Sequence, residues 1–325
     1  KGADAGAVNA AGQTPLMYAI KSNHVETALA LIDAGADVKL VTQNGDLAIV
    51  CAASNGLVQV VTRLLDKGAD INGMGRDNSA LTPLMAACWA GKLDVVKLLC
   101  ERGARLTQCN NYGEPALCSA ALQPNSEIIK YLLSRGAKVD DCGRDGFTPL
   151  MSACRWNRME NVKLLLAAGA DLTRRGWQRT VLSWAMEGGN LETVKLLLEK
   201  GADMKARNLG DGPGTSVLMI AVQCPNTEIV KYLIEKGANV RDRGPYGKPV
   251  IWYAAYKDRP ENLDILLKAG ADADLDAKYA HMPGFEPNCT LMDPGEMSSY
   301  SKEVKTLLKE AIERRKANAA EGGRK

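Results

Sequence analysis

The sequence predicts an all-α fold, a solenoid of stacked helix-turn-helix repeats. The first observation is a Gly-Ala-Asp-like segment whose glycines stand at positions 2, 35, 68, 103, 136, 169, 201, 237 and 270, with spacings of 33, 33, 35, 33, 33, 32, 36 and 33 residues. A period this regular is typical of a repeat solenoid. The second observation is that each interval holds two apolar helical segments of about ten residues, which are too short to persist alone in water. The repeats must therefore stack on one another.

The segment 145–171 shows the repeat most clearly. Thr148 followed by Pro149 predicts a helix start, because the threonine oxygen can accept from first-turn amides and the fixed φ of proline suits the first helical position. A second helix is predicted over Glu160–Ala168, and Gly169 stands where a left-handed C-terminal cap is needed. Eight first helices are predicted in this way, starting near Thr14, Leu47, Thr82, Pro115, Thr148, Thr180, Ser216 and Pro249.

These features resemble the ankyrin-repeat family. The resemblance rests on Thr-Pro-Leu at Thr14, Thr82 and Thr148, on the leucine-rich second helix and on Gly-Ala-Asp, and it extends to about Asp272. It implies an ankyrin-repeat solenoid with projecting hairpin fingers between the repeats. The family pattern is Thr-Pro-Leu-His, but the histidine position is held here by Met17, Met85, Met151 and Met219. We therefore expect apolar packing at this position, without the hydrogen bonds that the family histidines make between repeats.

The repeats divide the chain into four parts. Residues 1–13 are predicted to be the remnant of a preceding repeat with the first hairpin, and residues 14–272 to be eight ankyrin repeats. Beyond them the pattern degrades, and 273–316 are predicted to form an irregular loop and a modified capping repeat whose last helix is amphipathic. Residues 317–325 are predicted to be a disordered tail. Because the first repeat is incomplete, the sequence leaves open whether a catalytic or targeting domain precedes Lys1.

Composition favours a cytoplasmic protein without catalytic equipment. The net charge of +3 does not indicate nucleic acid or membrane as a partner, and no apolar stretch is long enough for a membrane span. Nine cysteines are an odd number, and several fall at small-residue positions of first helices, where free thiols pack as small hydrophobes. The alternative is that the protein is a secreted effector that acts inside a host cell.

Candidate chemistry is sparse. The two histidines, His24 and His281, lie in a turn and in an irregular loop, and no cluster of Cys and His has zinc-ligand spacing. His281 shares its loop with Cys289, but an irregular capping loop explains this better than a Cys-His pair. The sequence therefore predicts no enzyme, no metal and no cofactor.

Binding residues are predicted from the resemblance. In the family, partners dock on a concave groove formed by the hairpin tips and the exposed ends of the first helices. The matching positions hold Trp89, Tyr112, Arg144, Asp145, Phe147, Arg155, Trp156, Trp177, Arg179 and Tyr246. Tryptophan, tyrosine and arginine dominate interface hot spots. Alternatively, the aromatic side chains pack against neighbouring hairpin fingers, and the arginines form a solvated face of the protein.

Local charge indicates the kind of partner. The segment 144–179 carries seven basic and three acidic residues, a local charge of +4, which favours an acidic protein surface. The predicted function is a monomeric, non-catalytic scaffold or adaptor that binds a partner protein in the concave groove of repeats three to six. The alternatives are recognition of an anionic small molecule or nucleic acid by the basic groove, and a targeting module of a larger enzyme or effector.

Overall fold

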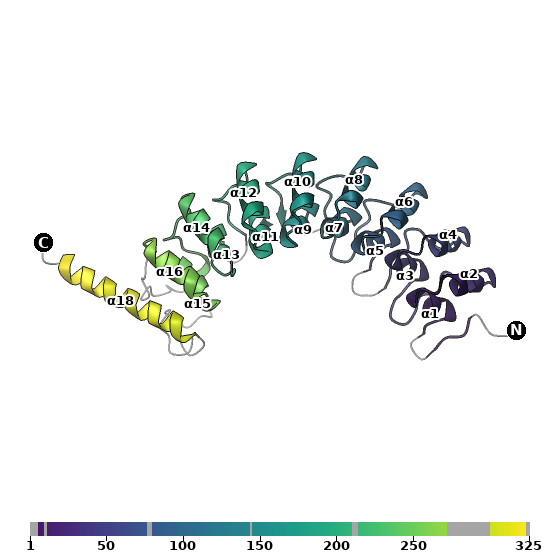
Figure 1. Ribbon diagram of the computed structural model, residues 1–325, viewed down its shortest axis with the longest axis horizontal. Helices are drawn as coiled ribbons and strands as arrows, with labels where there is room; N and C mark the ends of the chain where they lie inside the picture. Colours follow the sequence, from purple (N-terminus) through teal and green to yellow (C-terminus); the bar gives the residue numbers. More distant parts are fainter. Residues whose placement is uncertain are drawn as a thin grey trace. The chain divides into compact units, whose positions relative to one another are not determined.

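The computed structural model describes residues 6–9, 12–76, 80–143, 145–209, 214–271 and 300–322, with side chains as far as residue 314. The chain divides into two compact units, Lys1–Trp177 and Gln178–Lys325. Each unit is a series of antiparallel helix pairs, so the eight predicted helix pairs are all present (Figure 1).

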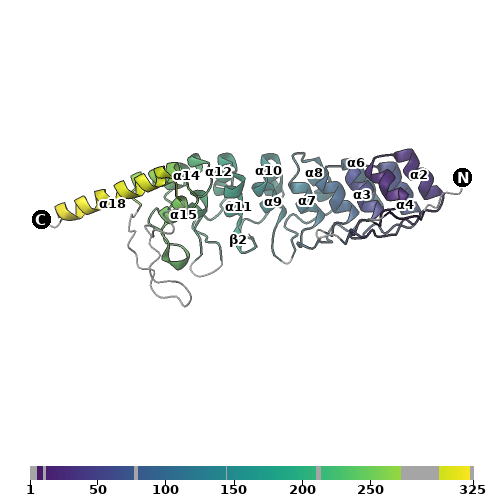
Figure 2. The same cartoon turned by 90° about the horizontal axis from the view of Figure 1, so that it is seen from below.

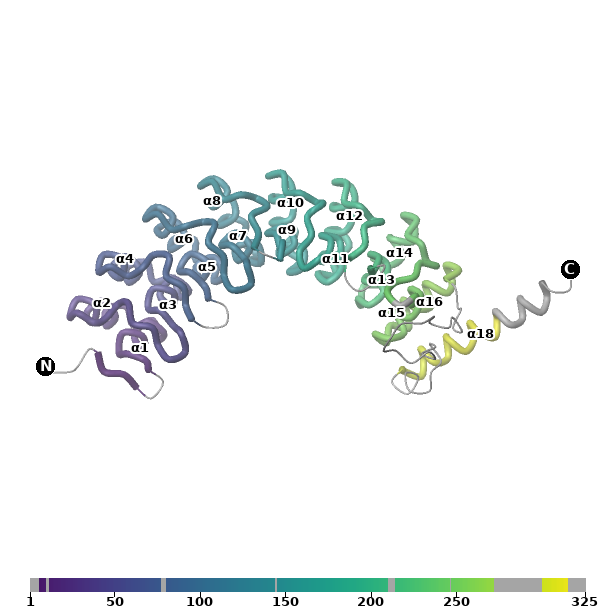
Figure 3. Tube along the Cα trace, turned by 180° about the vertical axis from the view of Figure 1, so that it is seen from behind, coloured from purple at the N-terminus to yellow at the C-terminus, as the bar shows by residue number. Residues whose placement is uncertain are grey.

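The first unit contains five helix pairs. They are α1 (Pro15–Lys21) and α2 (Val25–Asp33), α3 (Ala48–Asn55) and α4 (Val58–Asp66), α5 (Pro83–Trp89) and α6 (Leu93–Glu101), α7 (Ala116–Ala121) and α8 (Glu127–Ser134), α9 (Pro149–Arg155) and α10 (Met159–Ala167). Within this unit the first helices pack on one another in sequence order and form one layer, while the second helices form the other (Figure 3). The short strand β1 (Arg175–Gly176) ends the unit.

The second unit begins with the short strand β2 (Arg179–Thr180) and contains three helix pairs and a C-terminal helix. They are α11 (Val181–Gly188) and α12 (Leu191–Glu199), α13 (Val217–Ala221) and α14 (Thr227–Glu235), α15 (Val250–Tyr256) and α16 (Pro260–Lys268), and α18 (Lys302–Gly322). The 3₁₀ turn η1 (Pro245–Gly247) precedes α15. Strand β2 lies in a loop that projects beyond α11, as Figure 2 shows.

Threonine caps start the first helices as predicted. The Oγ1 atoms of Thr14, Thr82 and Thr148 accept hydrogen bonds from backbone N–H groups three residues later, at 3.2, 3.2 and 3.3 Å. The second helix of each repeat ends before a glycine in the left-handed region, where a Cβ atom would be strained, and Gly169 has φ of 86°. Local sequence therefore sets both ends of each helix pair.

The methionines at the family's histidine position pack as expected in the core. Met17, Met85, Met151 and Met219 are all at most 1% exposed. At the equivalent position of the sixth repeat, Ser183 donates from Oγ to Oδ1 of Asn208 at 2.6 Å, on the loop before the next helix pair. A hydroxyl is too small and too polar for apolar packing, so a hydrogen bond joins the repeats there.

One asparagine in each unit ties two neighbouring repeats together through both hydrogens of its amide. In the first unit Nδ2 of Asn161 donates to the backbone oxygens of Ala121 at 2.9 Å and Gln123 at 2.6 Å, at the end of α7. Arg158 donates to the oxygen of Leu122 between them, at 2.6 Å. The prolines that follow these turns have no N–H to pair with the carbonyls. The asparagine and arginine side chains therefore replace backbone donors, and we call this arrangement the carbonyl latch.

The second unit repeats the carbonyl latch at residue numbers that are each higher by 101. Asn262 donates to the oxygens of Val222 at 3.0 Å and Cys224 at 2.8 Å, and Arg259 donates to the oxygen of Gln223 at 3.1 Å. Repeats four and five thus have a counterpart in repeats seven and eight.

The C-terminal helix differs from the predicted one. Helix α18 continues to Gly322, six residues past the Lys316 at which the amphipathic pattern ends, so its backbone includes most of the predicted tail. Its first half packs on α16, and Val304 and Leu308 in that half are both fully buried. The division into residues 1–13, 14–272, 273–316 and 317–325 otherwise stays a prediction.

Candidate functional site

The first helices of repeats three and five end in large exposed side chains. Trp89 is the last residue of α5 and is 55% exposed, while Trp156 is the C-cap of α9 and is 53% exposed. Arg155, the last residue of α9, is also exposed. Each helix is ended at this point by a turn that returns the chain to the second helix, so side chains here project from the end of the helix pair. The predicted positions are thus open to solvent.

Tyr112 stands on a hairpin tip that its neighbour holds in place. Oδ1 of Asn110, itself buried, accepts hydrogen bonds from the backbone N–H groups of Tyr112 and Glu114, both at 2.9 Å. This double acceptance fixes the turn. The Tyr112 ring is 49% exposed, so it is presented on a constrained backbone.

Trp177 occupies an unusual backbone conformation. Its φ is 48° and that of Gln178 is 60°, so two residues with bulky side chains lie in the left-handed region that normally favours glycine or asparagine. The N–H group of Trp177 donates to the oxygen of Asp145 at 2.7 Å, which links two neighbouring hairpins. The indole is 44% exposed. Strained residues of this kind cluster at functional sites.

Phe147 is not the exposed anchor that the sequence predicted. It is 4% exposed and lies beneath Trp177, with ring centroids 5.7 Å apart and an interplanar angle of 26°. Gly176 makes this possible, because a Cβ atom there would stand 2.9 Å from the Phe147 Cα and 2.6 Å from the Met151 sulfur. The close approach of the next hairpin therefore buries Phe147, which supports Trp177 and does not present itself to a partner. For Phe147, the alternative of packing against a neighbouring finger is correct.

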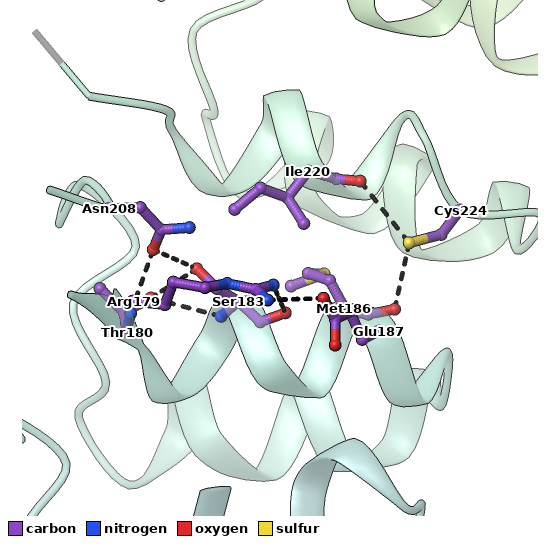
Figure 4. Close-up of polar contacts among 8 residues, drawn as sticks. All are labelled: Arg179, Thr180, Ser183, Met186, Glu187, Asn208, Ile220 and Cys224. Atoms are coloured by element: carbon purple, nitrogen blue, oxygen red, sulfur yellow. Dashed lines mark hydrogen bonds and ion pairs between the residues drawn. The ribbon is translucent and has the colours of Figure 1, made fainter. Parts of the chain in front are cut away.

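Arg179 begins the second unit and is engaged within it. Its Nη1 lies 2.6 Å from Oε1 of Glu187 (Figure 4). Its guanidinium lies 4.0 Å from the ring centre of Trp184, which is 1% exposed. Beside it the N–H of Thr180 donates to Oδ1 of Asn208 at 3.0 Å, the oxygen that also accepts from Ser183. These contacts give Arg179 a structural role in packing α11.

Two other arginines of the basic segment are also engaged. Arg158 belongs to the carbonyl latch, and Nε of Arg174 lies 3.7 Å from Oδ2 of Asp171. Of the remaining predicted positions, Asp145 is exposed, and its backbone oxygen accepts the bond from Trp177. Arg144 and the side chain of Tyr246 lie outside the residues that the structure describes.

Four cysteines of the first unit are buried, and their thiols are poor nucleophiles. Burial raises the pKa of Cys88, Cys118 and Cys154, and burial raises the pKa of Cys100 to about 11 although the nearby Arg135 lowers it. The eight cysteines of the described ranges are free thiols. Within the same ranges no group of three or more histidine, cysteine or acidic side chains could hold a metal ion. His281 and Cys289 lie outside these ranges.

Sequence reasoning missed two exposed tyrosines on first helices. Tyr18 on α1 is 65% exposed, and Tyr256, the last residue of α15, is 57% exposed. Tyr256 stands at the same position of its repeat as Trp89 and Arg155. The repeat register alone could therefore have singled it out.

Comparison with known proteins decides the family. The family description "ankyrin repeats (3 copies)" matches six overlapping ranges, which are residues 1–74, 27–110, 73–142, 105–176, 140–208 and 182–277. The chain is an ankyrin-repeat protein. The resemblance seen in the sequence is thus confirmed, together with the predicted fold class of stacked helical repeats. Ankyrin repeats generally mediate protein–protein interaction.

A solved structure agrees with this assignment. The human ASB11 ankyrin repeat domain is similar to this ankyrin-repeat chain, with 29% sequence identity and a TM-score of 0.60. The match covers 70% of this chain and 99% of that domain. No curated protein matches the chain. None of the helices in the described ranges combines the length and apolar character needed to cross a bilayer.

Proposed function

We propose that this ankyrin-repeat protein is a non-catalytic scaffold or adaptor that binds a partner protein on the hairpin tips and first-helix ends of repeats three to five. The observation that carries the proposal is the exposure of four large aromatic side chains on these parts of the first unit: Trp89, Tyr112, Trp156 and Trp177. We call these four residues the aromatic surface. They are about half exposed, although such side chains gain most from burial.

The constrained backbones of the aromatic surface support the proposal. Tyr112 is fixed by Asn110 and Trp177 by Asp145 and Phe147. A partner that covers these rings pays little ordering entropy, since the rings carry few rotatable bonds on rigid turns. Arg155 is the exposed basic residue beside Trp156 and is suited to a carboxylate of the partner. The sixth repeat is left out of this set because Arg179 is engaged by Glu187 and Trp184.

The test replaces two rings whose loss leaves the core intact. Trp89→Ala combined with Trp156→Ala is compared with the unaltered chain in a lysate pull-down read by mass spectrometry. Tyr18→Ala is the matched control, because it removes a ring of similar exposure from the first repeat. All three chains should melt at the same temperature, since each ring is more than half exposed.

The outcome is then measured with the purified partner. We expect Trp156→Ala alone to weaken the complex by about 2 kcal/mol, roughly thirtyfold in Kd, as for an interface hot spot. A partner that the double variant retains at full affinity contradicts the proposed surface. A partner lost by Tyr18→Ala as well places the site elsewhere on the first unit.

Salt separates this function from recognition of an anionic small molecule or nucleic acid. The affinity of binding through phosphate contacts falls steeply with ionic strength, whereas the affinity of an interface anchored by aromatic rings changes little. Arg158, Arg174 and Arg179 already contact groups of this chain, which favours the protein partner. We place this monomeric adaptor in the cytoplasm, where its free thiols would stay reduced.

A further inference from the structure

The sequence contains three Asn-Gly pairs, all of them in the first unit. They are Asn44-Gly45, Asn55-Gly56 and Asn72-Gly73. Because glycine has no Cβ atom, its backbone nitrogen can closely approach the side-chain carbonyl carbon of the preceding asparagine. This approach starts a deamidation that needs water and no enzyme. The three pairs differ in what holds the asparagine side chain.

Deamidation proceeds in two steps. The deprotonated backbone nitrogen of the glycine forms a bond to Cγ of the asparagine, the bond from Cγ to Nδ2 breaks, and the amide leaves as ammonia with the proton taken from solvent. Water then opens the resulting succinimide ring by adding to one of its carbonyl carbons. Opening at one carbon gives aspartate. Opening at the other gives isoaspartate, in which the main chain runs through Cγ and is longer by one carbon atom.

Asn44 lies at the tip of a hairpin, where its side chain can reach the reacting nitrogen. It is exposed, and in the described part of the first unit no hydrogen bond holds its side chain. The turn is closed by the N–H of Gly45, which donates to the oxygen of Thr42 at 2.9 Å. The side chain of Asn44 can therefore turn toward the Gly45 nitrogen without breaking a hydrogen bond of its own.

The other two asparagines are held by bonds to neighbouring repeats. Nδ2 of Asn55, the last residue of α3, donates to the oxygen of Ile20 at 2.8 Å. Oδ1 of Asn72 accepts from the N–H of Arg105 at 2.8 Å. Both asparagines are half-buried. In all three pairs the glycine N–H donates to a backbone oxygen three residues earlier, so the difference in reactivity comes from the asparagine side chains.

We propose that Asn44 is a site of spontaneous deamidation, and that isoaspartate formed there releases the link between the hairpins of repeats two and three. The link is the bond from the N–H of Arg76 to the oxygen of Gly45, at 2.8 Å. The tip is closed on its other side by the N–H of Asp46, which donates to Oγ1 of Thr42 at 2.9 Å. A turn closed in this way cannot take up an added carbon atom without displacing Gly45. The inference does not depend on the proposed function of the aromatic surface.

The test incubates the full chain at mildly alkaline pH in water enriched in heavy oxygen, which enters each deamidated residue. Peptide mass spectrometry measures the rate at each of the three asparagines, in the folded chain and in urea. In the folded chain we expect Asn55 and Asn72 to deamidate at least about fivefold more slowly than Asn44, because a hydrogen bond must first break at each. In urea the three rates should become similar, since glycine follows each asparagine.

Two variants test the consequence for the hairpins. The side chain of Asn44→Gln is too long to close the succinimide ring, and Asn44→Asp carries the product's charge on an unaltered main chain. After incubation, hydrogen exchange at the Arg76 amide should be about fivefold faster in the deamidated chain than in either variant.

Equal rates at the three asparagines of the folded chain would overturn the proposed site. Unchanged exchange at Arg76 in the deamidated chain would overturn the proposed release of the hairpins. Equally fast exchange in Asn44→Asp would assign the effect to charge and overturn the role of isoaspartate.

Discussion

Replacing Asn161 with alanine should lower the stability of the first unit through the loss of the carbonyl latch. Asn161 is fully buried, and both hydrogens of its amide are used, by the oxygens of Ala121 and Gln123. Neither oxygen can gain a backbone donor from Pro124, which has no N–H. The substitution therefore leaves two carbonyl groups without this partner and removes the tie between repeats four and five.

The magnitude follows from the number of bonds. Each hydrogen bond contributes about 1 kcal/mol net, and a buried acceptor left unpaired costs about 1–3 kcal/mol. The amide oxygen Oδ1 of Asn161 has no hydrogen-bond partner among the described residues, so its removal offsets part of the loss. We expect a fall of about 2 kcal/mol in the free energy of unfolding. Asn161→Asp should cost more, because a carboxylate cannot donate and would face two carbonyl oxygens.

Urea unfolding followed by circular dichroism measures the change, and native-state hydrogen exchange locates it. Exchange should accelerate in α7 and α8, which lose the tie, more than in α1 and α2. The control is Glu160→Ala in the same helix. At the surface, Oε1 of Glu160 lies 2.8 Å from Nζ of Lys163, and the loss of this ion pair should change stability by less than about 0.5 kcal/mol. If Asn161→Ala were no more destabilising than Glu160→Ala, the carbonyl latch would not be a stabilising element.

Three further predictions concern the helix caps and the buried thiols. Thr148→Val should cost about 1 kcal/mol in urea unfolding, because the bond from the N–H of Met151 is lost, and Thr148→Ser should restore most of it. Burial raises the pKa of Cys88, so the unfolded chain loses that proton at a lower pH than the folded chain, and stability should fall above the ordinary thiol value of about 8.5. Between neutral pH and a pH of about 9.5, the free energy of unfolding of Cys88→Ala should fall less than that of the unaltered chain. Equal slopes of this free energy against pH in the two chains would contradict the prediction. Iodoacetamide should leave Cys88, Cys118 and Cys154 unmodified in the folded chain and modify them in urea, as read by mass spectrometry.

The elements that could be predicted from the sequence depend on local chemistry. Thr148 before Pro149 indicates a helix start, because cap and first turn lie within four residues, and Gly169 indicates the end of the next helix for the same reason. The burial of Met151 follows from its place in a repeated pattern. Each of these inferences needs only a short window and the register of the repeat.

The features that the sequence did not predict depend on groups from other repeats. Phe147 has the sequence position of an exposed contact residue, and only the approach of Gly176 from the next hairpin buries it. The pairing of Arg179 with Glu187 is an exception, because both residues belong to the sixth repeat, one before α11 and the other near its end. The donors of Asn161 meet acceptors 40 and 38 residues away, which no local window contains. The candidate surface was therefore predictable in its positions but not in which side chains remain exposed.

The recurrence of the carbonyl latch after 101 residues has a consequence for engineering. A chain spliced from Gly136 directly to Ala238 would keep the helix pair of repeat four and continue into that of repeat eight, with three repeat lengths removed. Asn262 and Arg259 would then meet the turn that Asn161 and Arg158 now hold, and Pro124 would still follow that turn. We therefore expect the two latched pairs to be interchangeable, with three repeats as the step by which this protein could be shortened or extended.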